Sequence, residues 1–133
     1  GLDLSGSMTY ADSRIKANSS YVATPGDTID KLQPRVPQWR ASALANYHWD
    51  AQLSTSLGLR YSGDQFSSLN NTDINGFAYT AASRFTVLDL RARYAFQPKL
   101  VAAVGIDNLT NTEYWNYHQY PGRTFVAELK YDF

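Results

Sequence analysis

Apolar and polar residues alternate along most of this chain with a period of two. The clearest stretch runs from Trp39 to Trp49, where the odd positions are apolar or aromatic and four of the five even positions are polar. The last stretch, from Phe125 to Phe133, follows the same pattern. Because successive side chains of a β-strand point to opposite faces, each stretch predicts a strand with one apolar and one polar face.

Four further stretches alternate in the same way, and none sustains the 3.6-residue period of a helix. The sequence therefore predicts an all-β fold, an antiparallel up-and-down meander of six strands without helices. The predicted strands are residues 2–12, 37–49, 52–64, 83–96, 99–109 and 122–133.

The connections between these strands alternate strictly between long and short. Those around residues 13–36, 64–82 and 109–122 are long and polar, whereas those around 50–51 and 97–98 are very short. A soluble sandwich gives no reason for such an alternation. In an outer-membrane barrel the periplasmic turns are short and the outer loops are long, so the pattern favours a barrel wall.

Aromatic residues gather at the predicted strand ends, on the apolar face. Rings at this position suit a membrane, because aromatic side chains prefer the boundary between hydrocarbon and headgroups. The alternative is that they fill a sandwich core, but a core would not collect its largest rings at strand ends. The belt at the short-turn end would hold Tyr47, Trp49, Tyr94, Phe96, Tyr131 and Phe133, and the opposite belt Tyr10, Trp39, Tyr61 and Phe125.

The composition and the motifs of the chain exclude several classes of partner and site. Twelve basic residues balance twelve acidic ones, which argues against a nucleic-acid partner. The absence of cysteine excludes disulfides and thiolate metal sites. His48 and His118 lie in no nucleophile motif, so we expect no enzyme, no catalytic residue and no cofactor. Asn71, Asp73 and Asn75 have calcium-loop spacing, but Ala82 stands where a bidentate Glu is required, so a polar turn is favoured and no metal is expected.

Several segments in the C-terminal third carry motifs in a fixed order. They are Phe85–Phe96 with its L-D-L-R-A-R-Y run, Val104–Tyr114 with I-D-N-L-T-N-T-E-Y, Tyr120–Phe125 with Y-P-G-R-T-F, and Tyr131–Phe133. In order and spacing they resemble the end of TonB-dependent outer-membrane receptors. The resemblance covers roughly residues 32–133 and is weak before them.

This resemblance implies a 22-stranded transmembrane β-barrel that closes around an N-terminal plug. Residues 1–133 would then be the C-terminal portion of the receptor barrel, in the bacterial outer membrane, without the plug domain. The implied function is energised uptake of a ferric siderophore or a similar bulky nutrient. The implied partners are the remaining barrel and plug, the TonB complex, the outer-membrane assembly machinery, the lipid bilayer and the cargo.

Three groups of residues are candidates for these contacts. A rigid barrel presents its outer loops to ligand, and rings stack on planar ligands, which selects Tyr114, Trp115, Tyr117, His118, Tyr120 and Arg123. Mixed inward charges, expected on adjacent strands, are assigned to the plug: Asp89, Arg91, Arg93, Glu128 and Lys130. The terminal apolar pattern resembles the signal read by the assembly machinery: Phe125, Leu129, Tyr131 and Phe133.

Alternative functions remain open at this stage. A passive porin-type channel would share the alternation, the belts and the terminal Phe133, but would lack the motifs above. A free-standing β-sheet domain would have to cover its apolar face. An enzyme on a smaller barrel would need a nucleophile that the inward faces do not offer.

Overall fold

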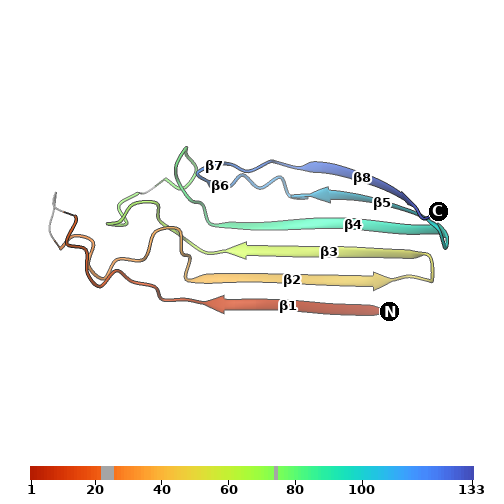
Figure 1. Cartoon of the computed structure of the whole chain (residues 1–133), viewed down its shortest axis with the longest axis horizontal. Helices are drawn as coiled ribbons and strands as arrows, with labels where there is room; N and C mark the ends of the chain where they lie inside the picture. Colours follow the sequence, from red (N-terminus) through yellow and green to blue (C-terminus); the bar gives the residue numbers. More distant parts are fainter. Residues whose placement is uncertain (22–25, 74) are drawn as a thin grey trace.

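A computed structural model describes residues 1–21, 26–73 and 75–133. Six strands form one sheet in the order β1-β2-β3-β4-β5-β8, each antiparallel to its neighbours (Figure 1). They are β1 (Leu2–Tyr10), β2 (Trp39–His48), β3 (Leu53–Ser62), β4 (Phe85–Gln97), β5 (Leu100–Asp107) and β8 (Thr124–Tyr131). The predicted six-stranded antiparallel meander is confirmed. In the described part of the chain there is no helix long and apolar enough to cross a membrane.

Two short strands in the last long connection were not predicted. They are β6 (Trp115–Asn116) and β7 (His118–Gln119), which pair as a small antiparallel hairpin. Tyr117 lies between them with a left-handed backbone, φ 72°. Strands of two residues are too short to produce a detectable alternation, so the sequence pattern did not reveal them.

The strand register gives the sheet its two faces. Residues that pair across an antiparallel sheet lie on the same face, so a row of partners shows what that face carries. One such row crosses all six strands and is entirely apolar: Leu4, Ala45, Leu57, Leu90, Ile106 and Phe125. A row on the other face, nearer the loop end, begins with Ser7, Ser42 and Arg60. The alternation seen in the sequence is therefore kept in register from strand to strand.

Aromatic rings pair at both ends of the strands, on the apolar face. At the loop end Tyr10 lies directly opposite Trp39, with ring centroids 4.7 Å apart. At the turn end each ring contacts another ring two residues further along the chain, in the same strand or just after its end, and the contact is edge to face. They join Tyr47 to Trp49 at 4.6 Å, Tyr94 to Phe96 at 4.9 Å and Tyr131 to Phe133 at 5.1 Å.

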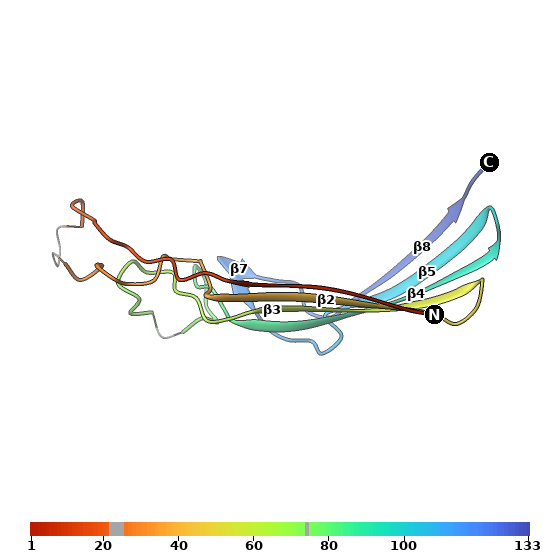
Figure 2. The same cartoon turned by 90° about the horizontal axis from the view of Figure 1, so that it is seen from below.

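The sheet bends along its length and has two open edges, β1 and β8 (Figure 2). Its apolar face is bare: the side chains of Leu4 and Phe125 are 72% and 74% exposed. The buried apolar residues among those described, Ala81, Ala82, Val87 and Tyr114, lie in the long connections or at the loop end of β4. A soluble sheet hides its apolar face behind a second layer, so this architecture suits contact with lipid better than a free-standing domain.

Candidate functional site

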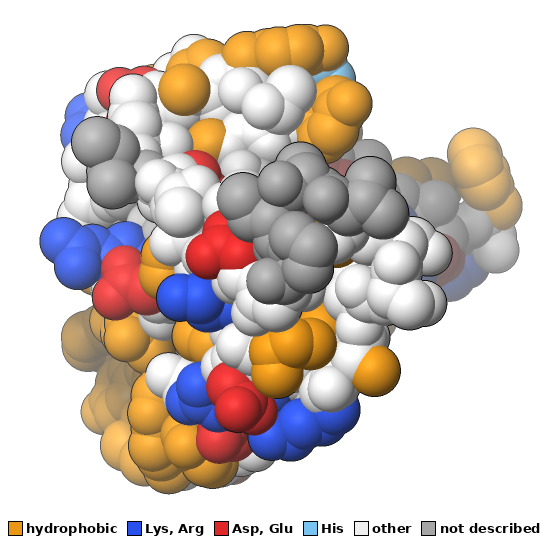
Figure 3. All heavy atoms as spheres, turned by 90° about the vertical axis from the view of Figure 1, so that its left-hand side faces the viewer, with side chains coloured by type: hydrophobic (Ala, Val, Ile, Leu, Met, Phe, Trp, Pro, Cys, Tyr) orange, Lys and Arg blue, Asp and Glu red, His pale blue; other side chains and the backbone are white. Residues whose placement is uncertain are grey.

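The three long connections gather at one end of the sheet, opposite the two short turns (Figure 1). They comprise residues 11–38, 63–84 and 108–123. Figure 3, which faces this end, shows basic, acidic and hydrophobic side chains close together. The loop end therefore combines the side-chain types from which a ligand site is built.

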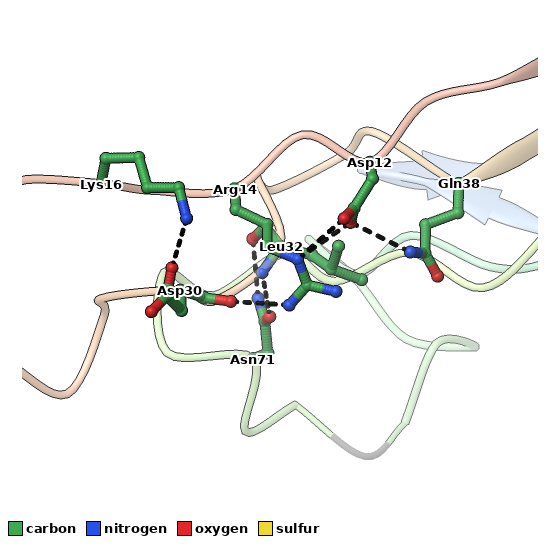
Figure 4. A network of polar contacts seen from close by, with 7 residues as sticks. All are labelled: Asp12, Arg14, Lys16, Asp30, Leu32, Gln38 and Asn71. Atoms are coloured by element: carbon green, nitrogen blue, oxygen red, sulfur yellow. Dashed lines mark hydrogen bonds and ion pairs between the residues drawn. The ribbon is translucent and has the colours of Figure 1, made fainter.

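The first and second long connections are joined through the Asn71 side chain (Figure 4). Its Oδ1 accepts a hydrogen bond from the backbone amide of Leu32 at 2.7 Å, and its Nδ2 donates to the Leu32 carbonyl at 3.0 Å. Asn71 thus satisfies both backbone groups of Leu32, as a neighbouring strand would. Asn71 itself has a left-handed backbone, φ 55°, which Asn tolerates better than most residues.

Ion pairs stabilise the first connection beside this contact (Figure 4). Arg14 Nε donates to Asp12 Oδ1 at 2.9 Å, and Lys16 Nζ lies 2.5 Å from Asp30 Oδ1. The hydrogen bond from Arg14 lowers the pKa of the Asp12 carboxyl, and that from Lys16 lowers the pKa of Asp30. All four side chains are solvent-exposed, so these pairs contribute little stability each.

The second and third connections form a β-like pair. The Thr80 amide donates to the Tyr117 carbonyl at 2.8 Å, and the Tyr117 amide donates to the Ala81 carbonyl at 2.9 Å. Ser83 and Trp115 add two more contacts, because the Ser83 amide donates to the Trp115 carbonyl and the Trp115 amide donates to Ser83 Oγ, each at 2.9 Å. These bonds hold the β6–β7 hairpin against residues 80–83.

Arg35 connects the first connection to the other two. Its guanidinium donates to the Thr80 carbonyl at 2.8 Å and to Asn116 Oδ1 at 3.0 Å. It also lies over the Tyr117 ring, with Cζ 5.1 Å from the centroid. A planar fork with several donors can make these contacts at once, which a lysine could not.

Beneath these contacts the polar face of the sheet is hollowed. The hollow has a volume of about 470 Å³, within the range typical of small-molecule sites. Its floor is formed by β1, β2 and β3, where Ser7 Oγ and Ser42 Oγ are hydrogen-bonded at 2.9 Å. Residues of all three long connections also line it. The lining includes Arg35, Arg40, Arg60, Tyr114, Asn116 and Tyr120.

Arginines dominate the charge of this hollow. Arg40 and Arg60 lie on neighbouring strands, because Arg40 pairs with Ser62 and Arg60 pairs with Ser42. Diagonal neighbours of this kind are about 7–8 Å apart between Cα atoms. Arg60 is paired with Asp89 on β4, with Nε 3.1 Å from Oδ2 and Nη2 3.3 Å from Oδ1. No acidic residue lines the hollow in the described part of the chain.

Two of the predicted ligand residues line this hollow, Tyr114 and Tyr120. Their rings are stacked, with centroids 4.6 Å apart and planes at 16°. Tyr114 is only 5% exposed and its ring also contacts Phe85 at 4.6 Å. Tyr114 therefore anchors the loop on the polar face, and Tyr120 presents the accessible ring.

The other predicted ligand residues lie outside the hollow. Tyr117 and His118 form an exposed cluster with Tyr79, whose ring centroid is 5.7 Å from that of Tyr117 and 5.0 Å from that of His118. Trp115 donates from Nε1 to Glu113 at 2.9 Å. Arg123 is exposed, and its backbone amide donates to Asn111 Oδ1 at 2.8 Å. The structure therefore divides the six predicted residues among several locations.

The residues predicted to face the plug are not all on adjacent strands. That expectation is wrong, because β5 lies between β4 and β8. Arg93 on β4 pairs with Ala103 on β5, which pairs with Glu128 on β8. The predicted meander already implied this arrangement, because the strand expected at 99–109 comes between those at 83–96 and 122–133.

Several of these charges already have partners within the sheet. Arg91 Nη2 lies 2.6 Å from Asp107 Oδ1. Its side chain crosses Gly105, where an added Cβ would be only 2.3 Å from Arg91 Cδ. Asp89 pairs with Arg60, and Lys130 pairs with Asp132 at 3.2 Å. Gly105 is thus the residue that allows Arg91 to cross β5.

The residues predicted as the assembly signal lie at the open edge of the sheet. Phe125, Leu129 and Tyr131 are on the apolar face of β8, opposite Ile106, Ala102 and Leu100. Phe133 follows the strand and packs its ring on Tyr131. All four side chains are exposed.

The loop with calcium-like spacing uses its carboxylate internally. Asp73 accepts hydrogen bonds from the Ser67 amide and hydroxyl at 2.8 and 3.0 Å, and from the amide and hydroxyl of Ser68. Partial burial by itself would raise the pKa of Asp73, but these hydrogen bonds outweigh it and lower the pKa to about 2. No cluster of three metal-ligating side chains occurs within residues 1–21, 26–73 and 75–133.

Sequence reasoning missed Arg35, Arg40 and Arg60 as site residues. The alternation itself places Arg40 and Arg60 on the polar face, so the signal for these two was present. Arg35 lies in a long connection between Pro34 and Pro37, with a left-handed backbone at φ 61°. Its position over the sheet depends on how the loop folds, which no periodic pattern encodes.

Comparison of the chain with known protein families and structures bears on the function of this site. The family model described as TonB dependent receptor-like, beta-barrel matches residues 1–109. The match includes residues 1–31, where the motifs are weak, and the motifs after residue 109 lie outside it. No curated protein sequence matches the chain.

Solved structures match the fold over nearly the whole chain. The siderophore receptor PiuA from Acinetobacter baumannii superposes with a TM-score of 0.83 at 20% identity, covering 98% of this chain and 19% of that one. The unliganded ferric citrate transporter FecA gives 0.79 at 20% identity, covering 98% and 21%. A mutant of the ferric enterobactin receptor PfeA from Pseudomonas aeruginosa gives 0.69 at 19% identity, covering 100% and 20%. The chain thus spans about a fifth of the length of these structures.

Proposed function

This chain belongs to the TonB-dependent receptor family, and on that premise we propose that it is part of the wall of an outer-membrane transporter. The transporter takes up a ferric siderophore or a similar bulky nutrient, driven by the TonB complex. It lies in the bacterial outer membrane, with the aromatic belts at the two lipid boundaries. The complete barrel has 22 strands and a plug, and it acts as a transporter rather than as an enzyme.

The observation that carries this proposal is the hollow on the polar face. Three loops from separate parts of the chain form its rim at the end opposite the short turns. In a barrel wall the polar face points into the lumen and the long loops point outward. The hollow therefore lies where cargo from outside first meets the lumen.

Two further assignments accompany this function. Arg93 and Glu128 face the plug, because they lie on the polar face, near the turn end, with only Ala103 between them. Phe133, with Phe125, Leu129 and Tyr131, is read by the assembly machinery, since β8 offers an unpaired edge with an apolar face.

The test measures uptake by the complete receptor that carries this chain. Cells that lack their own receptors and express this one should accumulate ⁵⁵Fe from a ferric chelate, and deletion of TonB should abolish the accumulation. The control is the same strain with the empty vector.

A porin-type channel predicts a different result. Small solutes would then enter at the same rate with and without TonB, and the purified protein would conduct ions steadily in a planar bilayer. That pair of results would overturn the transport proposal.

A further inference from the structure

The hollow differs from the rest of the polar face in its charge. Elsewhere on that face basic side chains have acidic partners, as in the pairs of Arg91 with Asp107 and of Lys130 with Asp132. The hollow is lined by Arg35, Arg40 and Arg60, and by no acidic residue among those described. A site with this lining attracts anions and repels cations.

Not all three arginines are equally available. Arg60 has its carboxylate partner in Asp89, and Arg35 uses two of its donors on Thr80 and Asn116. Arg40 is exposed, and no hydrogen bond or ion pair joins its guanidinium to any described residue. Arg40 therefore has all its donors free for a ligand.

The neighbours of Arg40 leave room for such a ligand. Across the strands it is flanked by Thr9 on β1 and Ser62 on β3, both short polar residues. The residues Tyr114 and Tyr120, whose rings are stacked, line the same hollow, as do Gln65 and Asn116. Cationic donors beside an aromatic ring fit a ligand with planar anionic groups, such as carboxylates or catecholates.

Arg35 has a different part in the same hollow. Its hydrogen bonds reach the second and third connections, so it fixes the rim while its charge still faces the same volume. Loss of Arg35 would loosen three loops at once and obscure any effect on charge. Arg40 is the cleaner probe, because its substitution breaks no hydrogen bond or ion pair within the described part of the chain.

We propose that this hollow selects anionic chelates over neutral ones and that Arg40 contacts the anionic groups of the cargo. The inference rests on the proposed function and defines the class of cargo. It assigns discrimination to net charge, since neutral and anionic ferric complexes of similar size would otherwise fill the hollow equally.

The experiment uses the purified complete receptor and two ferric complexes that differ in charge. One is an anionic ferric tris-catecholate and the other a neutral ferric tris-hydroxamate, each titrated by calorimetry at low and at physiological salt. Wild-type receptor should bind the anionic complex at least about tenfold more tightly, with an affinity that falls as salt rises.

Three variants locate this preference. Arg40→Gln should weaken binding of the anionic complex about tenfold, the effect of losing one charge-assisted contact, and leave the neutral complex unchanged. Arg40→Lys should recover part of the loss, because it keeps the charge but not the fork. The matched control is Arg84→Gln, which removes the same charge at the same end of the sheet but outside the hollow, where Arg84 lies 3.6 Å from Asp64.

Each other outcome overturns the inference. Equal affinity for the two complexes refutes charge selection. A preference that Arg40→Gln leaves intact, or that Arg84→Gln abolishes equally, places the selection elsewhere. A loss of receptor from the membrane without a change in affinity assigns Arg40 to assembly.

The proposed function is tested separately by uptake in cells. TonB-dependent uptake without charge preference leaves the function standing and refutes the inference. Charge-selective binding without TonB-dependent uptake supports the charge selectivity of the hollow and refutes the proposed transport function. If the receptor neither binds nor takes up either complex, both the inference and the proposed function are refuted.

Discussion

The two ends of this sheet are built in opposite ways. At the turn end, the connection between β2 and β3 is closed over a few residues: Asp50 Oδ1 accepts hydrogen bonds from the amides of Gln52 and Leu53, each at 2.7 Å. At the loop end, contacts join distant parts of the chain, and the hydrogen bond from Arg35 to Asn116 spans 81 residues. The same six strands thus connect short turns, each closed between neighbouring strands, with a loop end assembled from three separate segments.

The stability of the sheet and the ligand specificity of the hollow therefore depend on different parts of the chain. The β2–β3 and β4–β5 hairpins can form without the loops, because a short turn joins the two strands of each. The hollow exists only when all three long connections are in place. Changes at the loop end should therefore alter the site and leave the barrel wall intact.

The largest effect is expected from Tyr114→Ala. Removing a buried ring that packs on Tyr120 and Phe85 should cost roughly 3 kcal/mol of local stability. Amides of residues 108–123 in the complete receptor should then exchange with deuterium much faster, while those of the turn at 49–52 should not. Tyr117→Ala, at an exposed ring, is the control. Equal effects of the two variants, or faster exchange at the turn, would contradict the separation of the two ends.

A smaller loss, about 2 kcal/mol, is expected from Asn108→Ala, again by hydrogen exchange. The buried Asn108 side chain donates to the Thr112 carbonyl and accepts from the Thr112 amide, each at 2.8 Å, and its backbone is left-handed at φ 53°. Asn108→Gly keeps the backbone and loses only the side-chain bonds, so it should cost about 1 kcal/mol less. If Gly is as damaging as Ala, the backbone conformation is not a source of the loss.

At the turn end, Asp50→Ala should have a weaker and strictly local effect, because Asp50 is fully exposed. Hydrogen bonds from the amides of Leu53 and Gln52 lower the pKa of Asp50. Those two amides should lose protection, and the hollow should keep its affinity for ligand. A change in affinity would show that the two ends are coupled.

The smallest effect at neutral pH concerns Asp73. Its pKa is lowered to about 2 in the fold, so its contribution is complete above the ordinary carboxyl value of 3.8 and is lost as the pH falls through about 2. After correction for intrinsic rates, the amides of Ser67 and Ser68 should keep constant protection from pH 7 to about 4. Asp73→Asn should reduce their protection at every pH. A loss of wild-type protection already at pH 5 would refute this assignment.

Most of the sheet could be predicted from the sequence, whereas only part of the site could. The period-two pattern places Arg40 and Arg60 on the polar face, but their meeting with Arg35 needs a loop whose course is set by contacts such as Asn71 with Leu32. Tyr114 and Tyr120 were found as aromatic loop residues. Their spacing does not show that Tyr114 is buried and Tyr120 accessible. This difference arises because Tyr114 packs on Phe85.

The sequence by itself determined the strands, their two faces, the aromatic belts and the family. These features repeat every second residue or lie in short motifs, and neighbouring residues suffice to specify them. The tertiary structure decided that a small hairpin forms at Tyr117, that Tyr114 is buried while Tyr120 is accessible, and that three arginines share one hollow. Such arrangements depend on hydrogen bonds between segments far apart in the chain, and those bonds exist only once the sheet has brought the segments together.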